Sequence, residues 1–239
     1  MTNIKNTLKR YLKSFNAVFW IVYYKSIRKN KYKELFKKEF KNVHVVCPGP
    51  SVQDFFTSEH GAGKEDVIIL VNHALNLYPD LKKFTDNIFY FSSDGTRVKE
   101  SIKLKSELLE KVFSVVSSVH LFHLDKTIIR AINVATLPRL TFTKKFGFTG
   151  VNNGPNNFGA LKKRPIASGF GSLVYSLQLA VKFNPEIIRL WGCDFGDNKG
   201  KRYFTEDVPA RKIEAFEKTK KHFEIVEKII KRNGINIIR

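Results

Sequence analysis

Small and polar residues stand where the apolar runs of this sequence end. Cys47-Pro48-Gly49-Pro50-Ser51 follows one such run, and its two prolines and glycine prevent a strand from continuing. A turn of this kind presents the start of the next helix, with Ser51 as its cap, to an anionic ligand. The other segments of this type are Asn72-His73, Ser93-Asp94-Gly95 and Gly192-Cys193-Asp194, and small residues at Ser168-Gly169 open a predicted helix. Each alone is ordinary turn chemistry, but together they are candidates for one ligand site, because small residues let a ligand approach the backbone.

Cations and a phenol follow the last of these segments, in the stretch KGKRYF at 199–204. Arg202 and Tyr203 could neutralise a departing phosphate, although an exposed basic loop would have the same composition. The sequence contains neither a Walker loop nor a Gly-x-Gly-x-x-Gly motif, so standard motifs indicate neither bound ATP nor NAD. Its two cysteines form no CxxC or Cys/His cluster, which disfavours a zinc site and a disulfide scaffold.

The elements that must position these residues alternate between strand and helix. Apolar runs predict strands at 43–47, 67–72, 88–92, 119–124, 186–191 and 235–238. Helices are predicted at 97–113, 168–183 and 211–232, and loops at 146–163 and 192–209. This alternation predicts an α/β fold, with a Rossmann-like, mostly parallel sheet covered by helices on both faces. Since ligands collect beyond the carboxyl ends of parallel strands, the small and polar segments should converge at one edge of the sheet.

Positive charge is concentrated at the start of the chain. The formal net charge is +20, and residues 1–41 carry twelve Lys or Arg against two Glu. Apolar residues between 4 and 22 recur at three- and four-residue steps, which predicts a basic amphipathic helix suited to an anionic membrane surface. Packing of this helix on the domain is the alternative, and no recognisable motif supports a nucleic-acid partner. We therefore expect a membrane-associating segment at 1–41 and a ligand-binding domain at 42–239.

The same segment is not expected to span the membrane. The longest uninterrupted apolar run, 17–24, is far shorter than the roughly 20 residues that a spanning helix needs. The first 24 residues also lack a small-residue cleavage site and contain several lysines, which disfavours a signal peptide. The sequence thus predicts a cytoplasmic protein, peripheral on the inner face of the cytoplasmic membrane.

A series of motifs resembles the bacterial sialyltransferases of glycosyltransferase family forty-two. These motifs are CPGPS at 47–51, VNH at 71–73, FSSDG at 91–95, IASGFGS at 166–172 and GCDF at 192–195, and the resemblance spans residues 45–238. It implies a CMP-sugar donor. The donor-binding positions would be Gly49, Pro50, Ser51, Asn72, Ser168 and Gly169, with Ser93 and Asp94 replacing the family's Asn-Pro-Ser segment and Asp194 at the late strand end. Tyr203 matches one of the two tyrosines that steady the leaving phosphate in that family, while Gly196 stands at the place of the other.

The general base is the largest departure from the family. The family has a histidine between the tyrosine and the last helix, whereas residues 205–211 contain none. Glu206 and Asp207 are the nearest groups able to accept a proton from an acceptor hydroxyl, and His222 lies inside the predicted last helix, where we expect a surface position. This departure leaves the donor open between CMP-sialic acid and CMP-Kdo. The resemblance and the basic N-terminus together favour a lipid-linked saccharide acceptor, such as lipopolysaccharide, and imply no required cofactor.

Two alternatives stay open. The sequence also resembles archaeal-type 6-hydroxymethylpterin pyrophosphokinases, which share a GPS loop and a late Gly-x-Asp strand end. Such an enzyme would need Mg²⁺, for which Asp94, Asp194 and Asp197 are available. The missing histidine is also compatible with a non-catalytic adaptor that binds an anionic membrane surface.

Overall fold

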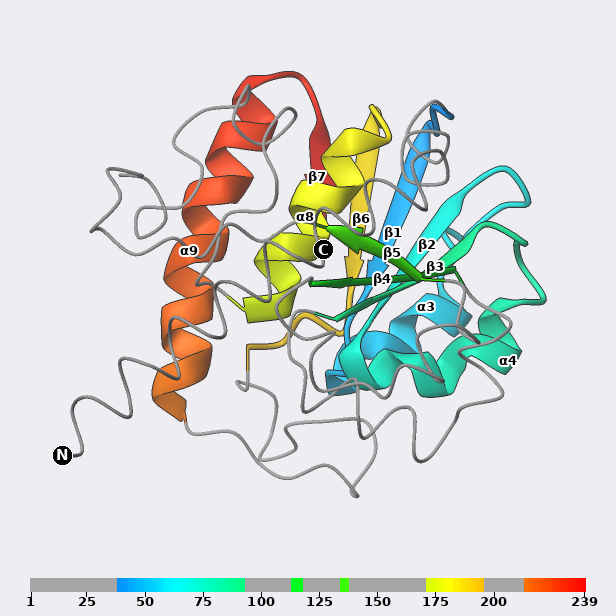
Figure 1. Cartoon of the computed structure of the whole chain (residues 1–239), viewed down its shortest axis with the longest axis horizontal. Coiled ribbons are helices and arrows are strands. Elements are labelled where there is room, and N and C mark those ends of the chain that lie inside the picture. The colour runs from blue at the N-terminus through cyan, green and yellow to red at the C-terminus, as the bar shows by residue number, and fades with distance from the viewer. Residues whose placement is uncertain (1–37, 93–112, 118–133, 138–170, 196–212) are drawn as a thin grey trace, which may run out of the picture.

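The structure, a computed structural model, describes residues 38–92, 113–117, 134–137, 171–195 and 213–239 (Figure 1). The strands are β1 (Asn42–Val46), β2 (Val67–Val71), β3 (Ile88–Ser92), β4 (Phe113–Ser117), β5 (Val134–Leu137), β6 (Ile187–Trp191) and β7 (Asn236–Ile238). The helices are η1 (Pro50–Gln53), α3 (Asp54–Thr57), η2 (Asn72–Leu77), α4 (Tyr78–Leu81), α8 (Gly171–Lys182) and α9 (Ile213–Arg232), of which η1 and η2 are 3-10 helices.

The described strands form one sheet in the order β5-β4-β3-β2-β1-β6-β7, and every neighbouring pair is parallel. From β1 the chain adds strands outward as far as β5, and then it returns to the other side of β1 to add β6 and β7. The direction of winding therefore reverses between β1 and β6. In open α/β sheets such a reversal, at the carboxyl ends of the two strands, is where ligands bind.

Helices cover both faces of the sheet, because successive side chains of each strand point to opposite sides. In β2, Val67, Ile69 and Val71 pack into a cluster with α8 and α9, while Ile68 and Leu70 pack into a second cluster with α3, η2 and α4. Figure 1 shows the two groups of helices on opposite sides of the strands. All five residues of β2 are buried, as expected for a strand in the interior of a parallel sheet. The predicted α/β fold with a parallel sheet is thus confirmed.

Most predicted elements in the described part of the chain are confirmed. The strands expected at 43–47, 67–72, 88–92, 186–191 and 235–238 are β1, β2, β3, β6 and β7, and the helices expected at 168–183 and 211–232 contain α8 and α9. No strand was predicted at Phe113–Ser117, where the structure has β4, and the assignment of Phe113 to the end of a helix is wrong. The short strand β5 was missed. Three predictions fall wholly or mostly outside the described residues: the strand at 119–124, the loop at 146–163 and the helix at 97–113.

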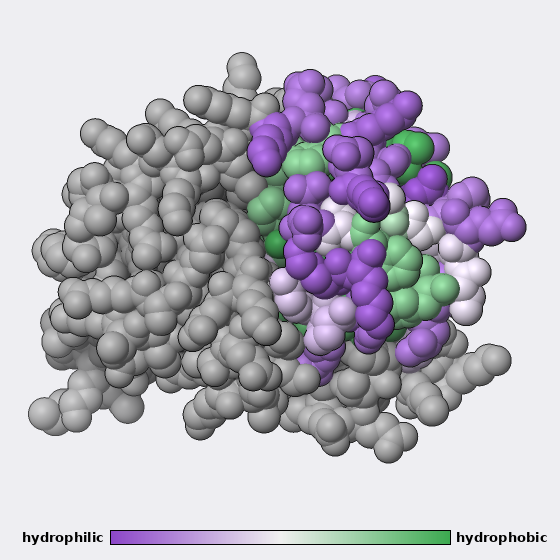
Figure 2. Space-filling view, turned by 90° about the vertical axis from the view of Figure 1, so that its right-hand side faces the viewer, coloured by the Kyte–Doolittle hydropathy of each residue, from purple (hydrophilic) through white to green (hydrophobic). Residues whose placement is uncertain are grey.

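The surface of the described residues offers little apolar area. Phe56 and Ile225 are the large hydrophobic residues exposed there, at 36% and 51%. Figure 2 shows the side on which α4 lies, where hydrophilic side chains surround smaller groups of hydrophobic ones. No helix in the described ranges is both long enough and apolar enough to cross a bilayer. The predicted amphipathic segment falls almost entirely within residues 1–37, outside those ranges.

Candidate functional site at the carboxyl edge of the sheet

The loops after β1 and β6 are joined where the winding of the sheet reverses. The N–H of Cys47 donates to the carbonyl of Trp191 at 2.8 Å, and the N–H of Gly49 donates to the carbonyl of Gly192 at 2.9 Å. The pairing of the two strands therefore continues past their ends into the loops. This extension holds the β1 loop, which was predicted to bind a ligand, against the β6 loop.

Both glycines are required by this close approach. A Cβ on Gly49 would overlap the carbonyl oxygen of Gly192 and the carboxylate of Asp194, and it would lie 2.9 Å from the Gly192 carbonyl carbon. Gly192 has a φ of +65°, which disfavours any side chain, and its Cβ would overlap the carbonyl oxygen of Cys47. The loops thus approach one another more closely than any other residue type would allow.

A carboxylate fixes the start of η1. The backbone N–H of Ser51 donates to Oδ2 of Asp194 at 2.9 Å, which links residues 143 positions apart. The expectation that Ser51 caps a helix is wrong, because Gly49 occupies the N-cap position, no side chain caps it, and Ser51 lies inside η1. Asp194 therefore already supplies the negative charge that a helix start attracts. We interpret Asp194 as a positioning residue for the loop that contains Gly49, Pro50 and Ser51.

Asn72 lies at the same edge, directly after β2. Its φ is +53°, a conformation that asparagine tolerates better than most residues. Its Oδ1 accepts hydrogen bonds from Ser92 Oγ at 2.9 Å, at the end of β3, and from Ser172 Oγ at 3.2 Å, at the start of α8. Because the Oδ1 atom faces both hydroxyls, the Nδ2 amino group of Asn72 faces away from them. The amide is thereby oriented as a hydrogen-bond donor, a role that a nucleotide site can use.

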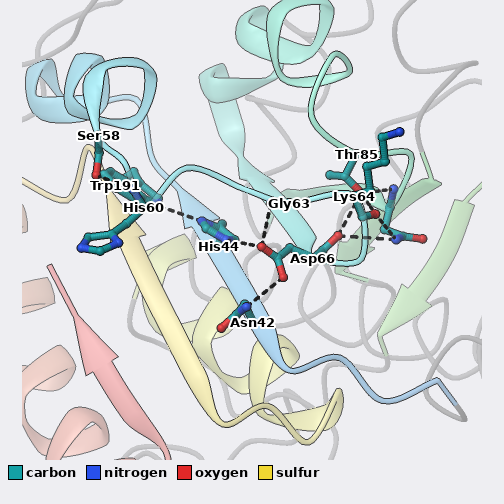
Figure 3. Close-up of polar contacts among 10 residues, drawn as sticks. Asn42, His44, Ser58, His60, Gly63, Lys64, Asp66, Thr85 and Trp191 are labelled. Atoms are coloured by element: carbon teal, nitrogen blue, oxygen red, sulfur yellow. Dashed lines mark hydrogen bonds and ion pairs between the residues drawn. The ribbon is translucent and has the colours of Figure 1, made fainter.

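A buried polar network, not predicted from the sequence, lies on the α3 side of β1. The Nδ1 atom of His44 accepts the indole N–H of Trp191 at 3.1 Å, so the proton of the neutral imidazole is on Nε2, 3.3 Å from Oδ2 of Asp66 (Figure 3). Asp66 also accepts from Asn42 Nδ2 at 2.9 Å and from the N–H of Gly63 at 2.8 Å. Burial lowers the pKa of His44, and the nearby carboxylate partly offsets this effect. The network ties β1 to β6 and to the start of β2 beneath the candidate site.

A pocket of about 330 Å³ opens next to the joined loops. It shares Ser51 and Asp194 with the edge of the sheet and extends along β6 past Trp191 to Arg189. The remaining lining residues come from α3 and the loop after it, and from β6, β7 and the residues that follow these strands; they are Asp54, Ser58, His60, Leu190, Cys193, Ile238 and Arg239. Its volume lies at the lower end of the range of about 300–1,000 Å³ found for ligand pockets.

The structure brings together only part of the predicted site. Gly49, Pro50, Ser51 and Asp194 meet at the ends of β1 and β6, and Asn72 lies beyond the neighbouring strand β2. The other predicted site residues lie outside the described residues, and they are Ser93, Asp94, Ser168, Gly169, Arg202, Tyr203, Glu206 and Asp207. His222 lies in α9, as predicted, but it is half-buried where a surface position was expected. Within the described ranges, no three His, Cys, Asp or Glu residues are grouped so that they could hold a metal ion.

Comparison of the chain with models of known protein families, and with curated proteins, finds no match.

Proposed function

We propose that this protein is a glycosyltransferase that transfers a CMP-activated acidic sugar, sialic acid or Kdo, to a lipid-linked glycan such as lipopolysaccharide. The observation that carries the proposal is the oriented amide of Asn72 at the same sheet edge as the joined Gly49 and Gly192 loops. The motifs that resemble family forty-two place donor binding on these two segments. A donor group held at a topological switch point is also the usual arrangement in open α/β sheets.

The reaction proposed is an inverting displacement. The acceptor hydroxyl oxygen forms a bond to the anomeric carbon, the bond from that carbon to the phosphate oxygen breaks, and the electron pair leaves with CMP. The hydroxyl proton passes to Asp207 or Glu206 as general base. Charge that develops on the phosphate oxygens is stabilised by Tyr203 and Arg202, since donors and cations aimed at such charge lower the barrier. The reaction requires no redox cofactor and no metal ion.

The acceptor and the location follow from charge. The formal net charge of +20 and the basic segment 1–41 suit an anionic membrane surface, where juxtamembrane cations are attracted to lipid headgroups. A lipid-linked acceptor would be presented at that surface. We therefore place the enzyme peripherally on the cytoplasmic face of the membrane.

Thermal denaturation with CMP, CDP and ATP, each with and without Mg²⁺, tests the donor class. A ligand that binds only the folded state raises the free energy of unfolding by about 2.7 kcal/mol when its free concentration is a hundred times its Kd. We expect CMP to raise the melting temperature without Mg²⁺, and Asn72→Ala to weaken CMP binding about tenfold or more. Asn184→Ala is the matched control, because Asn184 has the same left-handed backbone (φ +54°) and its side chain bonds Glu39 on an exposed surface.

Two results would overturn the proposal. One is the absence of any stabilisation by CMP at millimolar concentration, which would leave the adaptor as the better interpretation. The other is stabilisation by ATP with Mg²⁺ in the absence of any CMP effect, which would favour a pyrophosphokinase. Equal loss of CMP binding in the Asn72 and Asn184 variants would assign the effect to backbone strain and remove Asn72 from the site.

A further inference from the structure

The pocket beside β6 has the chemistry of a saccharide site. We infer that it binds a neutral sugar ring of the acceptor, an inference that rests on the proposed function. It extends that function by giving the acceptor a position and residues of its own. Three features carry it: a fixed indole, a rim of mixed charge, and continuity with the edge where the donor is proposed to bind.

The indole of Trp191 is half-buried and held in one orientation. Its N–H is bonded to His44, whose ring lies parallel to it with centroids 6.2 Å apart, and the ring of Phe55 packs edge-on at 5.2 Å. Figure 3 shows Ser58, His60 and Trp191 grouped on one side of His44, with Asp66 on the other. The π face of an indole carries partial negative charge, and it therefore suits the polarised C–H groups on one face of a sugar ring.

The polar lining contains charges of both signs. Asp54 and Arg189 both line the pocket, and among the described residues neither side chain has a hydrogen-bond or ion-pair partner. The carboxylate of Asp194 and the guanidinium of Arg239 line it as well, and Arg239 is paired with Glu227 at 2.7 Å. Two carboxylates and two guanidiniums give no excess of either sign.

This balance distinguishes between classes of ligand. An anionic group such as a phosphate would meet as many carboxylates as cations, whereas apolar ligands would leave the polar lining unpaired. A sugar ring has several hydroxyls, each of which both donates and accepts, so one ring can bond to Asp54, Arg189 and the serine hydroxyls. Neutral polyhydroxyl rings are therefore the ligand class that satisfies this lining.

The position of the pocket fits an acceptor. Its lining includes Ser51 and Asp194, which also form the junction of the β1 and β6 loops. A sugar bound against Trp191 would thus have hydroxyls next to the sheet edge to which the CMP-sugar is assigned. Its small volume suits a terminal ring, while the remainder of a lipid-linked glycan would lie outside.

Titration of ¹⁵N-labelled protein with monosaccharides tests the inference. The chain has two tryptophans, Trp20 and Trp191, so it gives two indole N–H signals, and the Trp191 signal is the one absent from Trp191→Phe. The probes are methyl β-galactoside, methyl β-glucoside and methyl N-acetyl-β-glucosaminide, with inorganic phosphate and CMP titrated separately. We expect at least one glycoside to shift the Trp191 signal in a saturable manner and to leave Trp20 unchanged.

Paired variants identify the lining. Asp54→Asn should weaken glycoside binding about tenfold or more, because a hydrogen bond to a charged group is replaced by a weaker neutral one. Asp80→Asn is the control, since Asp54 and Asp80 each lie in the first turn of a four-residue helix and Asp80 lines no part of this pocket. Arg189→Gln should give a similar loss.

The outcomes separate this inference from the proposed function. If CMP stabilises the protein but no glycoside shifts Trp191, the pocket is not an acceptor site and the donor proposal stands. If a glycoside shifts Trp191 and CMP does not bind, the pocket is a saccharide site but the transferase proposal fails. If CMP or phosphate saturably shifts Trp191 and Asp54→Asn weakens that binding, the pocket belongs to the donor and the inference is overturned. Equal losses in the Asp54 and Asp80 variants would also overturn it.

Discussion

Replacing Gly49 with alanine should open the junction between the β1 and β6 loops. The added methyl group would overlap the backbone carbonyl of Gly192 and the carboxylate of Asp194, which ends a short side chain held by a hydrogen bond. The Gly192 carbonyl is backbone that already accepts the N–H of Gly49, and the Asp194 carboxylate is bonded to the N–H of Ser51. The loop must therefore move away, and at least one of these bonds must lengthen.

The expected cost can be estimated from two contributions. Inserting a methyl group into a closely packed site typically costs about 1–3 kcal/mol. Losing the bond between Ser51 and Asp194, which is charge-assisted, adds about 1.5–3 kcal/mol. Since the loop can relax to avoid part of both costs, we expect Gly49→Ala to lower the free energy of unfolding by about 2–4 kcal/mol. For a protein of this size that corresponds to a fall in Tm of roughly 4–16 °C.

Calorimetry on four alanine variants separates contact from strain. At Gly61 a Cβ would be 3.5 Å from the nearest atom, an ordinary contact, and at Gly234 it would meet nothing within 4 Å but would have a φ of +83°. Gly61→Ala should leave Tm nearly unchanged, and Gly234→Ala should report backbone strain alone. Gly192→Ala combines strain with overlap and should cost most. A change of about 2–4 °C in Tm corresponds to about 1 kcal/mol for a protein of this size. If Gly49→Ala melts within about a degree of the unmodified protein, the substitution has almost no energetic cost and the loops are not packed as described.

Two further predictions concern His44 and Asp194. Because burial holds the pKa of His44 below its ordinary value of 6.5, the unfolded chain binds a proton that the folded chain does not. The free energy of unfolding, measured by urea denaturation, should therefore fall as pH drops below 6.5 toward the folded-state pKa. This fall should be shallower for His44→Gln. Parallel pH dependences for the variant and the unmodified protein would contradict the prediction. Asp194→Ala should cost about 1.5–3 kcal/mol, whereas Asp194→Asn, which keeps an oxygen acceptor for the Ser51 N–H, should cost clearly less. Equal melting temperatures for the two variants would show that Asp194 does not act through that hydrogen bond.

The sequence could predict the strands near β1 because buried parallel strands are short apolar runs bounded by polar residues. VIILV at 67–71 and IFYFS at 88–92 are such runs, and each predicted position is correct to within one residue. The run VFSVVSSVHLFHL at 112–124 is longer than one strand, so the pattern did not determine which part of it pairs with β3. The strand β5, VATL at 134–137, is too short to give a clear pattern.

Site residues that follow the end of a single strand could be predicted from the sequence. Contacts that depend on the order of the strands in the sheet could not. Gly49, Asn72 and Asp194 follow strand ends, so a parallel sheet was enough to place them at one edge. The bond from Ser51 to Asp194 needs β6 to lie beside β1, although the two residues are 143 positions apart. No local pattern encodes that adjacency. The contact between Trp191 and His44 was missed for the same reason, because each residue alone resembles an ordinary member of an apolar strand.

The contacts of Asp194 also bear on the choice between the two enzymatic functions. A magnesium-dependent diphosphotransfer needs carboxylate oxygens turned toward the phosphates, because Mg²⁺ takes most of its protein ligands from carboxylates. In the structure the Oδ2 atom of Asp194 instead accepts the backbone N–H of Ser51 and lies where a side chain on Gly49 would project. Binding Mg²⁺ through that oxygen would release the loop that is proposed to hold the nucleotide. Transfer from a CMP-sugar makes no such demand, since hydrogen-bond donors and cations can stabilise the leaving phosphate while Asp194 keeps the loop in place. The existing bond therefore commits the Oδ2 atom of Asp194 to positioning the loop, and a magnesium-dependent enzyme would have to take its ligands from the other carboxylate oxygen or from other residues.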